Sequence, residues 1–390
     1  MKLAFLSPFT TSVLKKYIPA LYYNNVPQGM GGSAVFELVK GLIETGIEIH
    51  ILTLQPGLEK IIEFHNNKVH YYLIPRRKKG SLRDLWRKER KLIIDTLRKI
   101  NADVVHANWT YEYALAAINY DRNKALITAH DIPYKVLKYT LSPYYLPLFF
   151  ISYYIYKKAK WITFVSNSVK NYAENYLSRD CKYWIIPNII NLSDYKDYIK
   201  NKEKNGTPEK YFISIGLWNR LKNLKTSIKA FSLFVEKNPE YYYILIGPGL
   251  EKNSKAEKWI LRNKYEKNII LLGKLSREET LFYLSKATAL IHPSFTEAHP
   301  MAVGEAMALG VPVIVGENSD GATELVKKGE FGFITNVKKK QNILKTMEYI
   351  ITNEKIDNTK NISKNFINDN YSVDKIIAEY MNIYLNISKV

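Results

Sequence analysis

The chain has 390 residues, enough for two domains of ordinary size. Its hydrophobic share of 46% and charged share of 24% are typical of a globular protein and exclude a disordered or fibrous chain. The single cysteine, Cys181, excludes an intrachain disulfide. We expect no secretory signal, because the apolar run at residues 3–6 ends at Ser7 and Pro8.

The net charge of +20 is concentrated in the first half of the chain. Residues 1–190 carry 27 Lys and Arg against 14 Asp and Glu, a net +13, which leaves 30 against 23, a net +7, for the rest. Such a surplus indicates either a solvated surface or a site for nucleic acid, anionic lipid or phosphorylated substrates. No nucleic-acid-binding motif accompanies it, so we expect no nucleic-acid partner. The densest group is Arg76, Arg77, Lys78, Lys79, Arg83, Arg87, Lys88, Arg90 and Lys91.

Residues 139–156 form a stretch of 18 residues without a charge, flanked by lysines on both sides. The length is near the lower limit for a membrane span. Pro143, Pro147 and six tyrosines argue against a span, because tyrosine prefers the membrane interface to the bilayer core. We predict a buried helix here, with an interfacial helix as the alternative.

Short apolar runs alternate with amphipathic segments along the chain, which predicts two α/β units with parallel sheets and helices on both faces. In the first half we expect strands at residues 2–7, 47–54, 68–74, 102–107, 125–129, 161–165 and 183–186, and helices at 32–45, 81–100 and 110–119. Residues 191–210 are polar and predict a linker. In the second half we expect strands at 211–215, 242–246, 269–272, 289–291 and 312–315, and helices at 224–237, 255–265, 277–287, 301–309 and 322–327. An irregular, Asn-rich approach then leads to a last helix at 373–387.

The strongest motif begins at His292, where a strand is expected to end. A loop with Glu297 follows, then a helix beginning near Pro300, and Glu305 lies eight positions after Glu297. Ligands of open α/β sheets bind beyond the carboxyl ends of the strands, and a helix that begins there offers free amides to a phosphate. We therefore interpret the motif as a ligand site rather than as a helix cap and a surface charge. The small residues Ala298, Ala302 and Gly304 are expected to keep the approach to this helix uncrowded.

This motif resembles the Glu-x7-Glu motif of the retaining glycosyltransferases of family 4. Other parts of the chain are similar to family elements in the same order: Gly31-Gly32, Asp103-Val-Val-His-Ala, Ile127-Thr-Ala-His-Asp, Val165-Ser166, Ile186-Pro-Asn-Ile-Ile, and Ile215-Gly216 with Lys222. The resemblance implies the GT-B fold, two Rossmann-like doubly wound domains that face a central cleft. Residues 1–192 would form the acceptor-side domain, 208–370 the nucleotide-sugar domain, and 371–390 a helix crossing back to the first domain.

The resemblance also implies an activity, the transfer of a sugar with retention from a UDP- or GDP-sugar to a carbohydrate or lipid-linked acceptor. In this reading Glu305 binds the ribose hydroxyls, Glu297 binds the donor-sugar hydroxyls, and Lys222 neutralises the leaving pyrophosphate. The other implied donor-binding residues are Gly31, Gly32, Gly216, Arg220, Met301, Ala302 and Val303.

His130 resembles the family's histidine near the reacting end of the sugar, and together with Lys222 and Glu297 it forms the implied catalytic set. Asp131 and Asn108 are the implied acceptor-side residues, while His106 is expected to be structural. Neither a metal cluster nor a cofactor is expected, because Lys222 and helix amides can replace a divalent cation. No carboxylate is evident for a double displacement, so we favour departure and attack on the same face of the sugar.

Three positions depart from the family pattern. Leu217 stands where arginine is common, so that Arg220 supplies the charge or Lys222 acts alone. Ala298-His299 replaces a common Gly-Phe pair, which leaves the identity of the sugar open. Asn108 stands where a second histidine is often found.

Other classes remain to be weighed, namely a non-catalytic sugar-nucleotide-binding protein or another enzyme of this fold such as a sugar-nucleotide epimerase. The expected location is the cytoplasm. Attachment to the cytoplasmic face of the membrane through the basic residues and the aromatic stretch is a further expectation.

Overall fold

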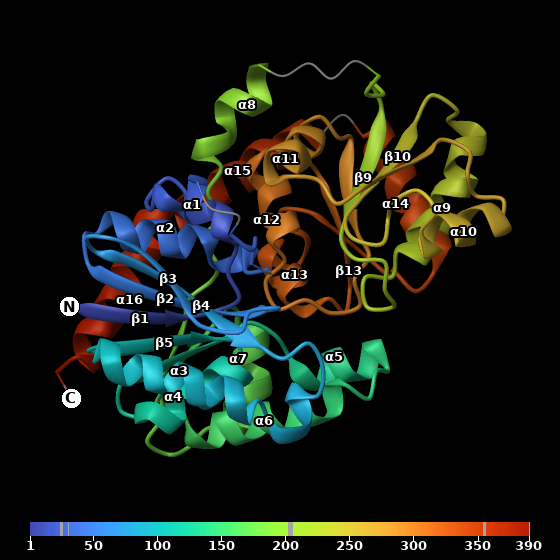
Figure 1. Cartoon of the computed structure of the whole chain (residues 1–390). Helices are drawn as coiled ribbons and strands as arrows, with labels where there is room; N and C mark the ends of the chain where they lie inside the picture. The colour runs from blue at the N-terminus through green and yellow to red at the C-terminus, as the bar shows by residue number, and fades with distance from the viewer. Residues whose placement is uncertain (24–25, 30, 202–205, 354–355, 390) are drawn as a thin grey trace. The chain divides into compact units, whose positions relative to one another are not determined.

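The computed structural model describes residues 1–23, 26–29, 31–201, 206–353 and 356–389, which form two compact α/β units (Figure 1). Unit 1 comprises Met1–Leu137, Ser142–Ile189 and Val373–Val390. Unit 2 comprises Lys138–Leu141 and Ile190–Ser372. The two units are described separately below.

Unit 1 is built on an eight-stranded sheet in the order β3-β4-β2-β1-β5-β6-β7-β8. All neighbours are parallel except β3, which pairs antiparallel with β4. The chain extends the sheet from β1 first toward β2 and then, in the other direction, toward β5. The strand order therefore reverses between β1 and β5, where ligands of such sheets bind. The strands are β1 (Lys2–Leu6), β2 (Glu48–Pro56), β3 (Ile62–Asn66), β4 (Val69–Arg76), β5 (Val104–Asn108), β6 (Ala125–Ala129), β7 (Trp161–Phe164) and β8 (Lys182–Ile185).

Helices cover both faces of this sheet (Figure 1). One face carries α2 (Phe36–Glu44) and the C-terminal α16 (Val373–Ile387), and the other carries α3 (Arg87–Ile100), α4 (Glu112–Asp121) and α6 (Tyr145–Lys158). A Cβ at Gly41 would lie 2.7 Å from Ile377, so this glycine lets α2 and α16 pack closely. His106 holds the same helix through a 2.7 Å hydrogen bond between its Nδ1 and the Tyr384 hydroxyl. The shorter helices are α1 (Ala20–Tyr23), α5 (Pro133–Thr140) and α7 (Asn167–Ala173).

Unit 2 has a six-stranded, fully parallel sheet in the order β11-β10-β9-β12-β13-β14, which reverses direction between β9 and β12. Its strands are β9 (Tyr211–Ile215), β10 (Tyr242–Ile246), β11 (Ile269–Gly273), β12 (Ala289–His292), β13 (Val313–Gly316) and β14 (Phe333–Thr335). One face packs against α9 (Leu224–Lys237), α10 (Lys255–Arg262) and α14 (Lys340–Thr352). The other packs against α8 (Lys196–Asn201), α11 (Arg277–Ser285), α12 (Met301–Ala308), α13 (Asp320–Leu325) and the end of α15 (Ile356–Asn370).

The helix predicted at residues 81–100 is interrupted. Leu85 and Trp86 both have positive φ angles, of 51° and 54°, and α3 begins only at Arg87. Trp86 is 1% exposed whereas Leu85 is 42% exposed, so the interruption directs one large side chain into the core and the other outward. Helical periodicity did not reveal this break, because two successive left-handed residues other than glycine are rare.

The linker predicted at residues 191–210 was wrong in part, since α8 occupies Lys196–Asn201. Its Tyr198 and Ile199 pack onto the core beside α11, which supplies the stabilisation that a short polar helix lacks by itself. Residues 202–205 lie outside the described part of the chain. The irregular approach to the last helix was also wrong, because it contains α15. The sequence did not predict β3, β14, α1, α5, α7 or α14 either.

The aromatic stretch at residues 139–156 is not the buried helix that was predicted. Its main element, α6, buries Leu148, Ile151 and Ile155 on one side, but Phe150 on the other side is 60% exposed. Among the described residues, no helix has the length and apolar character needed to cross a membrane.

Candidate functional site

The predicted donor residues of unit 2 gather where its strand order reverses. Lys222 follows β9, and Glu297 follows the neighbouring β12. The Nζ atom of Lys222 donates a hydrogen bond to Oε1 of Glu297 at 2.5 Å. The same oxygen accepts a second hydrogen bond, at 3.0 Å, from Nε2 of His292, the last residue of β12. His292 was not among the predicted site residues, because a histidine at the end of a strand is usually structural.

Glu297 remains a carboxylate in this cluster. Its side chain is only 14% exposed, and burial alone would raise the pKa of the carboxyl. The Lys222 ammonium and the hydrogen bond from His292 outweigh burial and hold the pKa of Glu297 well below its usual range. The cluster therefore presents one carboxylate and one ammonium at the carboxyl end of the sheet.

Backbone contacts fix the loop that carries Lys222. A Cβ at Gly247 would lie 2.1 Å from the carbonyl oxygen of Gly216, so the loops after β9 and β10 pack backbone to backbone. The stem of Lys222 lies over Gly216, at 3.5 Å from the position of a Cβ there. Asn223, in the left-handed conformation, donates from Nδ2 to the carbonyl oxygens of Pro293 and Val337 at 3.1 and 2.8 Å. The amide of Asn223 therefore ties the Lys222 loop to the Glu297 loop.

The helix expected near Pro300 is α12, which begins at Met301 with Pro300 as its N-cap. The first amides of a helix lack partners within the helix, which suits them to an anion. Of the three predicted donors, Val303 is less suitable, because its N–H already donates to the carbonyl oxygen of Pro300 at 3.2 Å. Gly304 also has a different role from the one expected. A Cβ there would lie 2.1 Å from Ile190, so the glycine accommodates core packing rather than a ligand.

Glu305 faces a basic residue that the sequence analysis missed. Its side chain is 11% exposed, and Oε1 lies 3.0 Å from the NH2 nitrogen of Arg277, the first residue of α11. The Arg277 guanidinium in turn lies 5.2 Å from the ring centroid of Tyr195. An arginine partner gives a buried glutamate a fixed orientation, as binding to ribose hydroxyls would require. No motif marks Arg277, because it lies 28 positions before Glu305 on another helix.

The Ala298-His299 pair lies in a tightly packed loop. The amide of Gly321 donates to the carbonyl oxygen of Glu297 at 2.9 Å, and a Cβ at Gly321 would overlap the backbone of Ala298. His299 is 9% exposed and lies 5.4 Å from the ring of Tyr371. Burial lowers the pKa of His299 to about 4, so the imidazole is neutral at pH 7. The departure from the family's Gly-Phe pair thus places a buried, uncharged ring at position 299.

The position of the missing arginine and one candidate for its charge, Arg220, are both at the surface. Leu217 is 45% exposed, and Arg220 is also exposed, without an ion pair to any residue that the structure describes. The structure therefore places Lys222, rather than Arg220, beside Glu297.

In unit 1 the predicted acceptor-side residues also lie beyond the ends of adjacent strands. Asn108 is the last residue of β5, and His130 follows β6. Nε2 of His130 donates to Oδ1 of Asn108 at 2.9 Å, and the ring of His130 lies 4.4 Å from that of Trp109. Asn108 is fully buried and accepts this hydrogen bond, so it fixes the His130 ring, and its expected place on the acceptor side stays a prediction.

Asp131, next to His130, accepts a 2.7 Å hydrogen bond from the Tyr111 hydroxyl. Burial raises the pKa of Asp131 to about 6, although the bond from Tyr111 lowers it. Gly31 and Gly32 have φ angles of 73° and 88°, and a Cβ at Gly32 would lie 2.2 Å from the carbonyl oxygen of Pro8 after β1. Glycine is therefore required at Gly32 for close approach of two loops.

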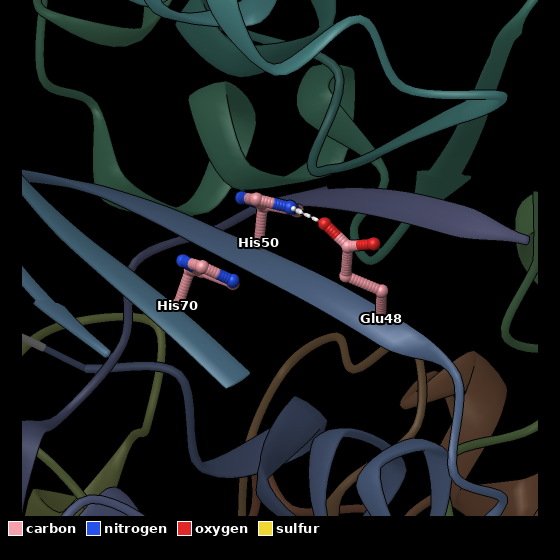
Figure 2. Close-up of side chains that lie close together, drawn as sticks. All are labelled: Glu48, His50 and His70. Carbon is pink, nitrogen blue, oxygen red and sulfur yellow. Dashed lines mark hydrogen bonds and ion pairs between the residues drawn. The ribbon is translucent and has the colours of Figure 1, made fainter. Parts of the chain in front are cut away.

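Unit 1 also contains a group of potential metal ligands that the sequence analysis did not identify. Glu48 and His50 on β2 and His70 on β4 have ligand atoms within 4.8 Å of one another (Figure 2). Nε2 of His50 hydrogen-bonds to Glu48 at 2.9 Å, and the rings of His50 and His70 stack at 4.2 Å with an angle of 10°. In stacked rings the nitrogen lone pairs run parallel and do not converge on one ion. The group lies at the beginning of β2, whereas His130 follows the carboxyl end of β6. The two lie at opposite ends of parallel strands, so the group of Glu48, His50 and His70 is outside the candidate site.

Comparison with known proteins identifies the family. The family models Glycosyltransferase Family 4 and Glycosyl transferases group 1 match residues 31–194 and 196–369, and thus cover most of both units. The chain belongs to glycosyltransferase family 4. This glycosyltransferase is 25% identical over 377 residues to the alpha-monoglucosyldiacylglycerol synthase of Acholeplasma laidlawii, covering 85% of this chain and 87% of the synthase. Two other curated relatives, 22% and 28% identical, are matched over only 55% and 61% of their own length.

Solved structures show that the glycosyltransferase has the GT-B fold. Sucrose-phosphate synthase from Thermosynechococcus elongatus matches with a TM-score of 0.79 and 16% identity over 99% of both chains. Anabaena HepE in complex with UDP and glucose matches with a TM-score of 0.72 and 17% identity, over 99% of this chain and 100% of HepE. In the glycosyltransferase, most residues expected to bind the donor lie in unit 2, whereas Gly31, Gly32 and the residues expected near the acceptor lie in unit 1.

Proposed function

We propose that this family 4 glycosyltransferase transfers a hexose, with retention of the anomeric configuration, from a UDP- or GDP-sugar to a lipid-linked acceptor. The observation that carries the proposal is the cluster of Lys222, Glu297 and His292 where the strand order of unit 2 reverses. It combines a cation for a leaving diphosphate with a carboxylate for sugar hydroxyls. The similar structure of Anabaena HepE, which was solved in complex with UDP and glucose, supports a nucleotide-sugar donor.

The donor is held by residues of unit 2. Glu305, oriented by Arg277, accepts hydrogen bonds from the ribose hydroxyls. The diphosphate lies at the beginning of α12 near the amides of Met301 and Ala302, where the helix dipole favours negative charge. In the free chain the Lys222 ammonium is hydrogen-bonded to Glu297. When the diphosphate binds Lys222, it competes for this ammonium, so that oxygens of Glu297 become available to the hydroxyls of the donor sugar.

Bond breaking and bond formation take place on the same face of the sugar. The bond between the anomeric carbon and the phosphate oxygen breaks, and a bond to the acceptor oxygen replaces it. The acceptor proton passes to the leaving phosphate, whose growing negative charge is stabilised by Lys222 and the α12 amides. A double displacement would need a carboxylate on the opposite face, whereas Glu297 is assigned to the hydroxyls of the donor sugar. In this proposal no divalent cation takes part.

His130 serves the acceptor side. Because Oδ1 of Asn108 accepts from Nε2, that nitrogen carries a proton and the orientation of the ring is fixed. We assign His130 to the acceptor side on this basis, and Asp131, hydrogen-bonded to Tyr111, lies next to it in sequence.

The proposed acceptor is a lipid at the cytoplasmic face of a membrane. Two features of unit 1 support this class, namely the exposed apolar side of α6 and the exposed cations between residues 78 and 91. The name of the relative from Acholeplasma laidlawii, a synthase of a glucosyl diacylglycerol, is in line with it.

Release of nucleoside diphosphate from UDP-glucose and GDP-mannose, with and without lipid extract as acceptor, tests the proposal. The Glu297→Gln variant should lose about 100-fold or more in kcat, whereas Glu317→Gln, a change of an exposed glutamate of the same unit, should be unaffected. Binding of nucleotide without release from any donor would instead indicate a non-catalytic binding protein. Conversion of the donor sugar without release would indicate an epimerase.

A further inference from the structure

A cavity of about 640 Å³ lies in unit 1 between α3, α4 and α6, which lie side by side on one face of the sheet (Figure 1). Leu115 of α4 forms part of its floor, and Leu146 and Phe150 of α6 form part of its wall. Its polar groups are the side chains of Arg90 and Asn119 and the hydroxyl of Tyr154. The volume is within the range of ligand pockets, roughly 300–1,000 Å³, and the lining is mostly hydrocarbon.

The mouth of the cavity exposes large apolar side chains to solvent. Leu146, Phe150 and Tyr154 follow one another at intervals of four on α6, so they share one side of the helix, and they are 48%, 60% and 43% exposed. Leu85, at the break before α3, is 42% exposed and lines the same cavity. A soluble surface rarely gathers such side chains around an apolar cavity unless they contact a partner or a membrane.

A cation lies inside the apolar lining. The Nε atom of Arg90 is buried and has no hydrogen-bond partner in the described part of the chain. Burial also lowers the pKa of Arg90, because a low-dielectric surrounding disfavours its charge. An anionic group in the cavity would satisfy this donor and neutralise the charge.

The segment that contributes Leu85 and Arg90 to the cavity lining is rich in basic residues. Arg77 does not contribute, because its guanidinium is bonded to Asp84 and Glu89 at 2.6–3.0 Å. Fewer of the cations identified from the sequence are therefore available to an anionic surface than their number suggested. The members that are exposed are Lys78, Lys79, Arg83, Arg87, Lys88 and Lys91.

We propose that this α3–α6 cavity binds one hydrocarbon chain of an anionic membrane phospholipid, whose phosphate is bound by Arg90. The exposed cations attract the anionic surface, the ring of Phe150 and its neighbours enter the interface, and the chain occupies the cavity. A second copy of this chain is a poor occupant, since the exposed cations of the two copies would face each other. The inference rests on the lipid acceptor of the proposed function and adds a specific lipid-binding site. Its test does not require turnover.

The test is co-sedimentation with vesicles of phosphatidylglycerol or of phosphatidylcholine at low and high salt. Wild type should bind phosphatidylglycerol vesicles, and Arg90→Gln should weaken this binding about tenfold, because a charge-assisted hydrogen bond is lost. Leu115→Trp fills the cavity without changing any charge and should weaken binding to a similar extent. The matched controls are Arg262→Gln and Leu385→Trp at exposed positions elsewhere, which should bind as wild type does.

Entry of the chain can be followed separately with phosphatidylglycerol brominated in its acyl chains. A tryptophan introduced by Phe150→Trp should be quenched, whereas one introduced by Leu261→Trp in unit 2 should not. Wild-type binding of Leu115→Trp, shown to be folded by circular dichroism, would overturn the assignment of the chain to the cavity. Absence of wild-type binding to anionic vesicles at low salt would overturn the whole inference, as would concentration-dependent dimerisation blocked by Leu115→Trp.

Release of nucleoside diphosphate is measured on the same samples. Intact release without vesicle binding contradicts only the lipid site. Vesicle binding without release contradicts only the proposed transfer.

Discussion

Lys222 and Glu297 are 75 positions apart in the sequence, yet the Nζ of one lies 2.5 Å from the Oε1 of the other. They follow β9 and β12, which are adjacent strands although two other strands lie between them along the chain. The pair therefore exists only because the sheet reverses its strand order at this point. The ammonium of Lys222 should therefore affect both the leaving phosphate and the pKa of Glu297.

Lys222→Ala should reduce kcat at least about 100-fold, because the leaving phosphate loses its cation. It should also raise the pKa of Glu297, which the ammonium of Lys222 now holds down. The check is a pH–rate profile of Lys222→Ala beside Lys237→Ala, a change of an exposed lysine on α9. Retained activity, combined with loss of activity in Arg220→Ala, would transfer the role to Arg220.

Glu305→Gln should weaken nucleotide binding by about tenfold, since charge-assisted bonds to ribose contribute roughly 1.5–3 kcal/mol. Arg277→Gln should produce a smaller loss in the same direction, because it leaves Glu305 in place but removes the partner that orients it. Calorimetric titration with UDP and GDP measures both effects, with Arg262→Gln as the matched control. Unchanged affinity in a folded Glu305→Gln protein would remove this residue from the nucleotide site.

Asn108→Ala should lower kcat while leaving donor KM nearly unchanged, because Asn108 is buried and acts by orienting His130. Asn108→Asp should keep the hydrogen bond and add a negative charge, which raises the pKa of His130. The expected signature is an acidic limb of the pH–rate profile displaced to higher pH. An identical profile in Asn108→Asp would show that His130 does not titrate in the reaction.

Acid should destabilise the fold, because two histidines are buried without charge. Burial lowers the pKa of His106, with a further contribution from nearby His130, to about 3, and burial lowers the pKa of His299 to about 4. Groups with a lowered folded-state pKa bind protons more tightly when unfolded, so their contribution is complete above about pH 6.5 and is lost as pH falls. Each histidine should cost about 2 kcal/mol of stability between pH 7 and pH 5.

Asp131 acts in the opposite direction over the same range. Its pKa is raised to about 6 in the fold, so ionised Asp131 destabilises the fold at pH 7. This penalty shrinks as pH falls, which offsets about 1 kcal/mol of the loss between pH 7 and pH 5. Urea unfolding of wild type and His299→Phe at both values isolates one histidine, since phenylalanine fits a buried ring position and does not titrate. An equal loss of stability in both proteins would exclude His299 as a source of the acid sensitivity.

Removal of divalent cations should leave activity intact, because Lys222 and the α12 amides are proposed to stabilise the leaving diphosphate. The measurement is nucleoside diphosphate release after treatment with EDTA. Complete loss that magnesium or manganese restores would contradict the metal-free mechanism. If only zinc restored activity, and His70→Ala abolished that rescue, the group of Glu48, His50 and His70 would be identified as a functional zinc site.

The sequence by itself determined most of the strand–helix alternation and the position of the Glu297–Glu305 motif between a strand and a helix. Strands such as Tyr211–Ile215 and helices such as Leu224–Lys237 match their predicted ranges, because an apolar run or an apolar face is a local property of the chain. Motif spacing likewise placed Glu297 and Glu305 on either side of the beginning of one helix.

Only the tertiary structure decided which side chains meet. Arg277 belongs to no motif, and the motif gave no contact between His292 and Glu297, so both partners were found only from the structure. The tertiary structure also decided which side chains are exposed. The aromatic stretch was predicted to be buried, but it packs against the sheet on one side only, and Phe150 remains exposed on the other. Periodicity records which residues share a side of a helix, whereas burial depends on what the rest of the chain places against that side.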